Sequence, residues 1–121
     1  MMRFHKFTIG HFWCSDFGNA EEGGYDYMIK YSPLHTVKQQ LYPATLVLTA
    51  DHDDRVVPLH TYKYVAELQY QAGAVEGQRP LLARIDVNAG HGGGKPTAMV
   101  IKENADCYAF IAKANECSWT D

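Results

Sequence analysis

The sequence predicts an α/β fold, in which strands and helices alternate along the chain. Two short segments, residues 44–50 and 81–87, have the composition of strands, and each is followed by a segment with helical periodicity. The order strand, helix, strand, helix is typical of parallel strands joined by a right-handed crossover. Because parallel sheets need covered faces and more strands, we expect this βαβα unit to be an incomplete sheet that belongs to a larger fold.

The first strand and its helix are separated by a charged loop. Residues 44–50 read ATLVLTA, an apolar run typical of a strand that is buried on both faces. Residues 51–55 read DHDDR and therefore form a loop, and Pro58 suits the first turn of a helix. Gly73 is a plausible end for this helix, whose predicted inner face consists of Thr61, Tyr64, Val65, Leu68 and Ala72.

The second strand leads into a glycine-rich loop and a last helix. Residues 81–87 read LLARIDV, and residues 89–94 read AGHGGG, a sequence typical of a flexible loop. Pro96 opens a helix with one apolar face, made of Ala98, Ile101, Ala105, Tyr108 and Ala112. We expect residues 1–24 to be irregular, because glycines interrupt any periodicity, and residues 25–31 to form a short helix that ends before a proline.

The composition and charge exclude several classes of function. A net charge of −3 and a pI of about 6.0 predict no nucleic-acid partner and no anionic membrane surface. No apolar run approaches the roughly 20 residues of a membrane helix, and the first residues lack the apolar stretch of a secretory signal. The 3 cysteines have no close C-x-x-C spacing, which indicates reduced thiols in a cytoplasmic protein or small buried apolar side chains.

Side chains suited to catalysis follow both predicted strands. In an open α/β sheet, ligands and catalytic groups lie at the carboxyl ends of the strands. Asp51, Asp53 and Asp54 follow the first strand and His91 follows the second, so we expect the two loops to lie side by side. An acid followed by a histidine is typical of the last two members of an α/β-hydrolase triad. Spacing alone leaves the acid open among the three aspartates, and a histidine among glycines is also common on protein surfaces.

Four sequence segments resemble those of one peptidase family. They are TADHDDRVVP at 49–58, AGHGGGKPT at 89–97, FHKFTIGHFW at 4–13 and YSPLH at 31–35. Together they are similar to the C-terminal part of the catalytic domain of the prolyl oligopeptidase (prolyl endopeptidase) family. The resemblance covers nearly the whole chain, so residues 1–121 are interpreted as one partial catalytic domain of the α/β-hydrolase fold. It implies a monomeric, cytoplasmic serine peptidase that cleaves short peptides after proline and needs no cofactor.

The resemblance assigns the triad roles to Asp53, as the acid, and to His91, as the general base. The third member is missing, because a nucleophile elbow reads G-x-S-x-G and none of Ser15, Ser32 and Ser118 has this context. In the family, the elbow and the β-propeller lie upstream of the matched segment. We therefore expect the chain alone to be inactive and poorly stable, and to need the rest of its domain as a partner.

The resemblance also assigns residues to the substrate pocket. Trp13 would stack on the proline ring of the substrate, and Arg55 would hold a carbonyl beside it, as an indole and a guanidinium can. Val56 and Phe17 would line the pocket, although Phe17 stands where the family has a tyrosine and removes its hydroxyl. Ordinary core packing for Trp13 and an ion pair with the neighbouring acids for Arg55 are the simpler alternatives.

Three other functions compete with this interpretation. Residues 89–97 resemble a phosphate-binding loop, but Ala89 replaces its first glycine and Pro96 replaces the residue that holds magnesium. A calcium or zinc site in the acidic loop would lack ligands at the required spacing, so we predict no metal site among Asp51, His52, Asp53, Asp54 and His60. A truncated, non-catalytic product that acts as an interaction partner stays open.

Overall fold

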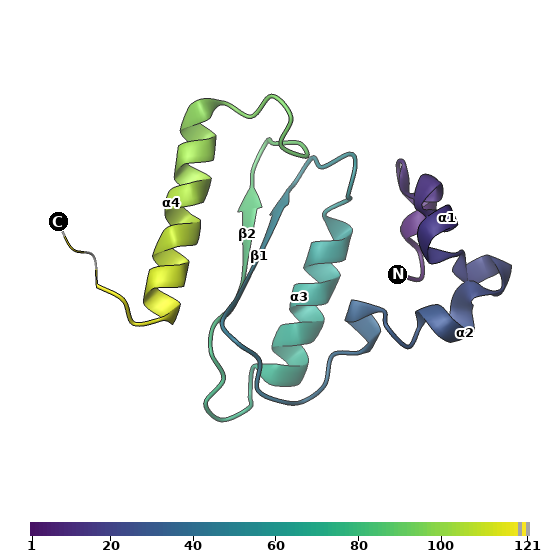
Figure 1. The fold of residues 1–121 in the computed structure, drawn as a ribbon, viewed down its shortest axis with the longest axis horizontal. Coiled ribbons are helices and arrows are strands. Elements are labelled where there is room, and N and C mark those ends of the chain that lie inside the picture. The colour runs from purple at the N-terminus through teal and green to yellow at the C-terminus, as the bar shows by residue number, and fades with distance from the viewer. Residues whose placement is uncertain (119, 121) are drawn as a thin grey trace.

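The fold is built around two parallel strands, as the sequence predicts (Figure 1). The structure is a computed structural model that describes residues 1–118 and 120. Strand β1 comprises Thr45–Ala50 and strand β2 comprises Leu81–Asp86, each one residue shorter than predicted. Thr45 pairs with Leu81 at one end of the ladder and Ala50 with Asp86 at the other. Both strands therefore end side by side, at the edge where we expect the site.

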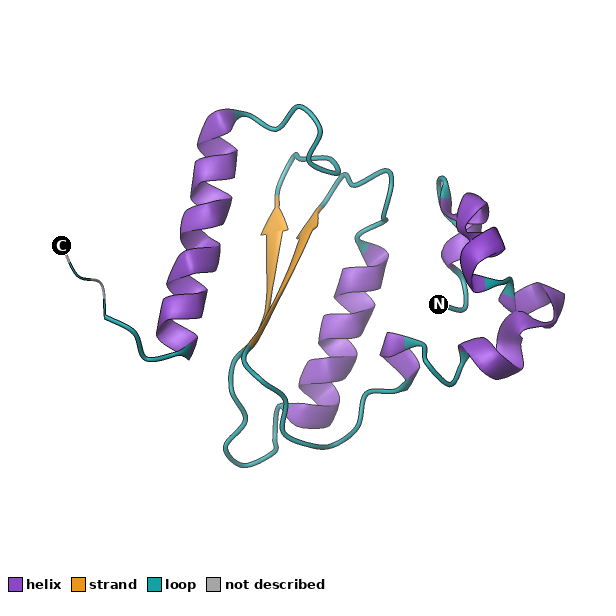
Figure 2. Cartoon of the chain, viewed as in Figure 1, coloured by secondary structure: helices purple, strands orange, loops and turns teal. Residues whose placement is uncertain are grey.

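Helix α3 packs on the sheet through the face that the sequence predicts. It comprises Leu59–Ala72, and Val65, Leu68 and Ala72 are its buried residues. Leu68 and Ala72 form the core with Leu81 of β2, and the half-buried residues around this core are Val37, Tyr42 and Tyr64. Figure 2 shows α3 beside the strands, with the connection from β1 to α3 at the top of the view. The apolar periodicity of this helix is thus explained by burial against the sheet.

Helix α4 presents a different face to the sheet from the apolar one noted in the sequence. It comprises Thr97–Ala114 and has no fully buried residue. The apolar side chains of Ile101 and Tyr108 are 63% and 62% exposed, whereas Glu103 and Asp106 are half-buried. The polar face is turned inward because Arg84 of β2 bonds Asp106, with 2.9 Å between Nε and Oδ2. The apolar face of α4 is left exposed within the described residues.

Residues 1–36 form a chain of short helical turns, so the prediction that residues 1–24 are irregular was wrong. Each turn spans only three to five residues, too few to produce a visible period in the sequence. Gly18 ends α1 at a φ of 82° and Gly23 forms a kink inside η3 at a φ of 84°, values which L side chains rarely adopt. The turns are η1 (Phe4–Lys6), η2 (Gly10–Trp13), α1 (Cys14–Phe17), η3 (Ala20–Gly24), α2 (Tyr25–Met28) and η4 (Pro33–His35). Of the helix predicted for 25–31, only Tyr25–Met28 is helical.

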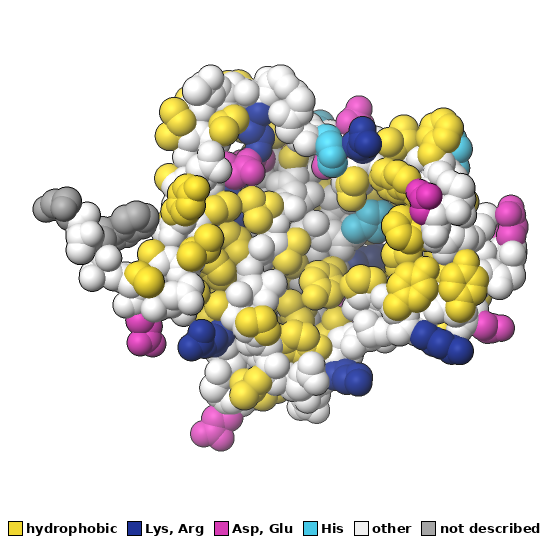
Figure 3. Space-filling model, in the orientation of Figure 1, with side chains coloured by type: hydrophobic (Ala, Val, Ile, Leu, Met, Phe, Trp, Pro, Cys, Tyr) yellow, Lys and Arg dark blue, Asp and Glu magenta, His cyan; other side chains and the backbone are white. Residues whose placement is uncertain are grey.

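Large apolar side chains lie on the surface of the described residues. Leu48 of β1 and Leu82 and Ile85 of β2 are each more than 40% exposed, although strands of a parallel sheet are normally covered on both faces. Figure 3 shows apolar side chains gathered over the sheet and over the N-terminal turns. The three thiols, of Cys14, Cys107 and Cys117, are free. In the described part of the chain, every helix is too short or too polar to cross a bilayer.

Candidate active site

The two loops that follow the strands lie side by side, as predicted. Backbone pairing continues past the ends of the strands: the Asp51 N–H donates to the carbonyl of Asp86 at 3.0 Å. The His52 N–H donates to the carbonyl of Ala89 at the same distance. These bonds align residues 51–57, the acid loop, with residues 87–96, the histidine loop (Figure 2).

The side chain of His91 contacts one of the three aspartates. Its Nδ1 lies 2.8 Å from Oδ2 and 3.0 Å from Oδ1 of Asp53. With the proton on Nδ1, the imidazole donates to this carboxylate and keeps Nε2 as the free acceptor. Spacing left the acid open among Asp51, Asp53 and Asp54, and the geometry brings Asp53 to the histidine.

The carboxylate of Asp53 is held by its own loop. It is 9% exposed and accepts hydrogen bonds from the backbone N–H groups of Arg55, at 3.0 Å, and Val56, at 2.8 Å. Burial of this carboxyl opposes ionisation, but the hydrogen bonds from Val56, His91 and Arg55 outweigh it and lower the pKa of Asp53. Asp53 is therefore an ionised, oriented acceptor for the imidazole.

His91 is far more accessible than the acid that it contacts. Its side chain is 46% exposed, and a side-chain carbon added at Gly92, Gly93 or Gly94 would meet no atom within 4 Å. Gly92 and Gly94 adopt φ values of 111° and 72°, which other residues disfavour. The free edge of the ring is thus open to a group that approaches from outside the described residues.

Asp51 joins the two loops, a role that sequence reasoning missed. Its Oδ2 accepts from the N–H of Asn88 at 3.0 Å, and its Oδ1 accepts from the N–H of Ala89 at 3.2 Å. Oδ1 also lies 2.7 Å from Nδ1 of His52. The bonds from His52, Asn88 and Ala89 lower the pKa of Asp51 to about 2, against a smaller opposing effect of burial. The sequence showed only that three aspartates of the acid loop are candidates for the acid that contacts His91.

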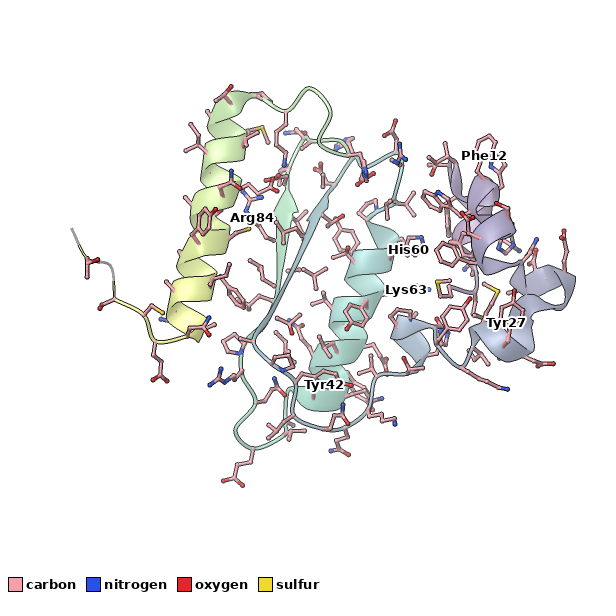
Figure 4. The ribbon with its side chains drawn as sticks, in the orientation of Figure 1. Phe12, Tyr27, Tyr42, His60, Lys63 and Arg84 are labelled. Carbon is pink, nitrogen blue, oxygen red and sulfur yellow. The ribbon has the colours of Figure 1, made fainter. Side chains whose placement is uncertain are left out.

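An apolar cavity lies between the N-terminal turns and α3. Its volume is about 650 Å³, and Trp13, Phe17 and Val56 are in its wall, as are His60 and Lys63 of α3. Figure 4 shows His60 and Lys63 on the side of α3 that faces the N-terminal turns. Three of the four residues predicted for the substrate pocket therefore share one cavity.

Aromatic contacts and one hydrogen bond hold the wall of this cavity against the acid loop. Phe4 is buried, with its ring centroid 6.4 Å from that of Trp13 and 6.1 Å from that of Phe17. The hydroxyl of Thr8 donates to the carbonyl of Arg55 at 3.2 Å. Trp13 is half-buried rather than a core residue, so its indole keeps an accessible surface.

Arg55, the fourth predicted pocket residue, is exposed and does not line the cavity. Its side chain takes part in none of the ion pairs among the described residues, so the alternative of an ion pair with the neighbouring acids is not observed. The guanidinium therefore extends from the acid loop toward solvent.

The charge of Lys95 is already paired, which argues against a phosphate-binding loop at 89–97. Its ammonium bonds the carboxylates of Asp86 and Glu103, and Asp86 also pairs with Arg84. A phosphate-binding lysine has to reach the phosphates instead. Within the described part of the chain, histidine, cysteine and acidic side chains form no group of three or more that could hold a metal ion.

An acid and a histidine on loops after neighbouring parallel strands define an α/β-hydrolase arrangement. The sequence model of the prolyl oligopeptidase family matches residues 1–116, and the chain belongs to this family. It is similar to prolyl oligopeptidase A of Galerina marginata, with 48% identity over 123 residues, and to the prolyl endopeptidase of Elizabethkingia miricola, with 48% identity over 113 residues. These matches cover 100% and 91% of the chain but only 16% of either relative, so the chain corresponds to part of a catalytic domain.

Solved structures of the same family share the fold. Prolyl oligopeptidase B from Galerina marginata, with a 35mer hydrolysis and macrocyclization substrate bound, superposes with a TM-score of 0.90 at 40% identity. That match covers 100% of this chain and 17% of the solved one. Oligopeptidase B from Leishmania major gives a TM-score of 0.74 at 34% identity, over 84% of this chain and 14% of that one. The predicted fold class and family are confirmed.

Proposed function

We propose that this chain supplies the acid and the histidine of a serine peptidase that cleaves short peptides on the carboxyl side of proline. The contact between Asp53 and His91, at 2.8 Å on adjacent loops of a prolyl oligopeptidase family chain, is the observation that supports it most. In this role His91 takes the proton of a serine hydroxyl and then gives it to the leaving amine. Asp53 fixes the tautomer and stabilises the imidazolium.

The serine has to come from outside these 121 residues. None of the serines in the chain stands in a G-x-S-x-G elbow. The exposed Nε2 edge of His91 is where such a hydroxyl would bind, within about 3 Å for proton transfer. The chain alone is therefore inactive, and residues 1–121 act as part of a domain whose remaining strands cover the exposed sides of β1 and β2.

The apolar cavity is the proposed site for the proline of the substrate. Trp13 offers an accessible flat surface to the ring, and Val56 and Phe17 complete the wall. Arg55, exposed on the acid loop, donates to a substrate carbonyl. Short proline-containing peptides are thus the proposed substrates, without a cofactor. The free thiols agree with a cytoplasmic parent enzyme, and we propose that this enzyme is a monomer.

A chimeric enzyme tests this proposal directly. The 121-residue chain replaces the matched 123-residue segment in prolyl oligopeptidase A of Galerina marginata, and hydrolysis of a fluorogenic peptide with a proline amide is measured. A control chimera carries the matched segment of the Elizabethkingia miricola enzyme, which is as similar to this chain as the Galerina marginata enzyme is. We expect activity in both chimeras, and none in the 121-residue chain alone. An active control beside an inactive chimera of this chain would refute the proposed function.

A further inference from the structure

The start of the histidine loop is attached to the acid loop by the side chain of Asp51 as well as by the backbone bond from His52 to Ala89. The two oxygens of Asp51 accept the consecutive N–H groups of Asn88 and Ala89, at 3.0 and 3.2 Å. These are the residues through which the chain leaves β2, and His91 follows Ala89 by two positions. The same carboxylate therefore sets where the histidine loop begins relative to Asp53, two residues further along the acid loop.

Where the chain leaves β2, it turns at Asn88 and then enters a glycine-rich loop. Asn88 has a φ of 57°, in the left-handed region that only glycine and a few polar residues adopt without strain. Beyond Ala89 the loop contains four glycines, and a side-chain carbon at three of them would meet no atom within 4 Å. The loop thus depends on its first residues for its position, because its middle has few packing contacts.

We propose that Asp51 is a positioning residue, which acts through the backbone of Asn88 and Ala89 to hold His91 against Asp53. This inference rests on the proposed function. Asp51 touches neither the imidazole of His91 nor the site of a substrate, and its effect is exerted on the geometry of the Asp53–His91 pair. A displacement of about 1 Å in such a pair costs roughly 100-fold in rate.

The test compares two neighbouring aspartates in the active chimera. Asp51→Asn keeps the size of the side chain but replaces one acceptor oxygen by an NH₂ group, which cannot accept from a backbone N–H. Asp54→Asn is the matched control, since Asp54 is an exposed acid of the same loop. We expect Asp51→Asn to lower kcat by roughly 10- to 100-fold with KM changed less than about twofold. Asp54→Asn should change neither value by more than about twofold.

A double variant separates positioning from general stability. Once Asp53→Asn has removed the partner of His91, adding Asp51→Asn should lower kcat by less than about threefold further, because the two changes disable the same contact. Fully multiplicative losses would overturn the proposal. The proposal would also be overturned if the Asp51→Asn enzyme were as active as the Asp54→Asn enzyme. The same holds if circular dichroism shows that the Asp51→Asn enzyme is unfolded at the assay temperature. If Asp53→Asn itself leaves kcat unchanged, the proposed function fails first.

Discussion

Residues 1–36 and residues 45–114 contribute to the same site by different means. In the second region, hydrogen bonds along β1 and β2 continue into the loops and bring Asp53 to His91. In the first region, aromatic rings pack around Phe4, and the contact with the acid loop includes the hydroxyl of Thr8. Under the proposed function, the proton-transfer groups are thus fixed by the directional bonds of the backbone, whereas the wall of the substrate pocket is fixed by the packing of side chains.

This difference predicts a division of kinetic effects. Groups that act only in the transition state change kcat, whereas groups that hold substrate and transition state alike change KM. We therefore expect variants of residues 45–114 near the loops to affect kcat, and variants of the aromatic wall to affect KM. The predictions that follow concern the active chimera.

The largest effect is expected at His91. His91→Ala should lower kcat by about 10⁶-fold and Asp53→Asn by about 10⁴-fold, because one removes the base and the other its oriented tautomer. The steady-state rate of hydrolysis of the proline amide peptide gives kcat for both variants. A matched control is His52→Ala, since His52 is an exposed histidine of the same site that pairs with Asp51 rather than Asp53. A His52→Ala loss as large as that of His91→Ala would contradict the assigned roles.

The second effect concerns the aromatic wall. Trp13→Ala should raise KM by about 10- to 100-fold, with kcat changed by only a few-fold, because stacking on a bound ring is lost. Trp13→Phe keeps a flat apolar surface and should recover most of this affinity. Steady-state kinetics with the proline peptide and with an alanine analogue measure the change. A loss confined to kcat would break the proposed division between the two regions.

The third effect is on stability, at the end of the histidine loop. The Lys95 ammonium lowers the pKa of Asp86, chiefly through their hydrogen bond, and the side chains of both residues are nearly buried. Lys95→Met leaves this carboxylate with Arg84 alone and should cost about 2 kcal/mol, because one partner of a nearly buried pair is removed. Lys102→Met is the control, as its pair with Asp106 is exposed and contributes less than about 1 kcal/mol. Thermal unfolding of both variants measures this difference in stability. Equal melting temperatures of Lys95→Met and Lys102→Met would contradict the prediction.

The smallest effect is a dependence of stability on acid pH. The pKa of Asp51 is about 2 in the folded protein, below the value of about 3.9 for an unfolded aspartate. The folded state therefore binds fewer protons, and this contribution to stability is complete above about pH 4 and is lost as the pH falls toward 2. Between about pH 5 and pH 3 the melting temperature should fall less in Asp51→Asn than in the unmodified chimera. If the melting temperatures of the two proteins fall in parallel with pH, the protonation of Asp51 does not contribute to the pH dependence of stability.

Much of the βαβα unit could be predicted from the sequence because burial imposes a period. Val65, Leu68 and Ala72 recur at helical spacing and are buried, and both apolar runs are strands. For α4 the period was misleading: its apolar face, with Ile101 and Tyr108, is exposed, since the polar face is drawn to Arg84. The turns of residues 1–36 were missed because three to five residues carry no period.

The sequence predicts the candidate site in outline, and the geometry distinguishes its residues. Topology placed the acid loop beside the histidine loop, but it could not distinguish three aspartates that are one or two residues apart. Their differences arise from the direction of each side chain: Asp53 points to an imidazole and Asp51 to two backbone N–H groups. The resemblance to the family names Asp53 as the acid, and Asp53 is the aspartate whose carboxylate lies 2.8 Å from the imidazole of His91. Asp51 carries no signal in the sequence that separates it from its neighbours.

The contact between Asp53 and His91 joins residues 38 positions apart. Closing a loop of this length costs little more entropy than closing a much shorter one, because the cost grows only with the logarithm of the length. The contact depends on the pairing of β1 with β2, which brings the two loops to the same edge of the sheet. Under the proposed function, the acid and the base lie in one βαβ unit, whereas the nucleophile comes from a separate segment, so a piece of the domain that contains only this pair is incapable of cleaving other chains.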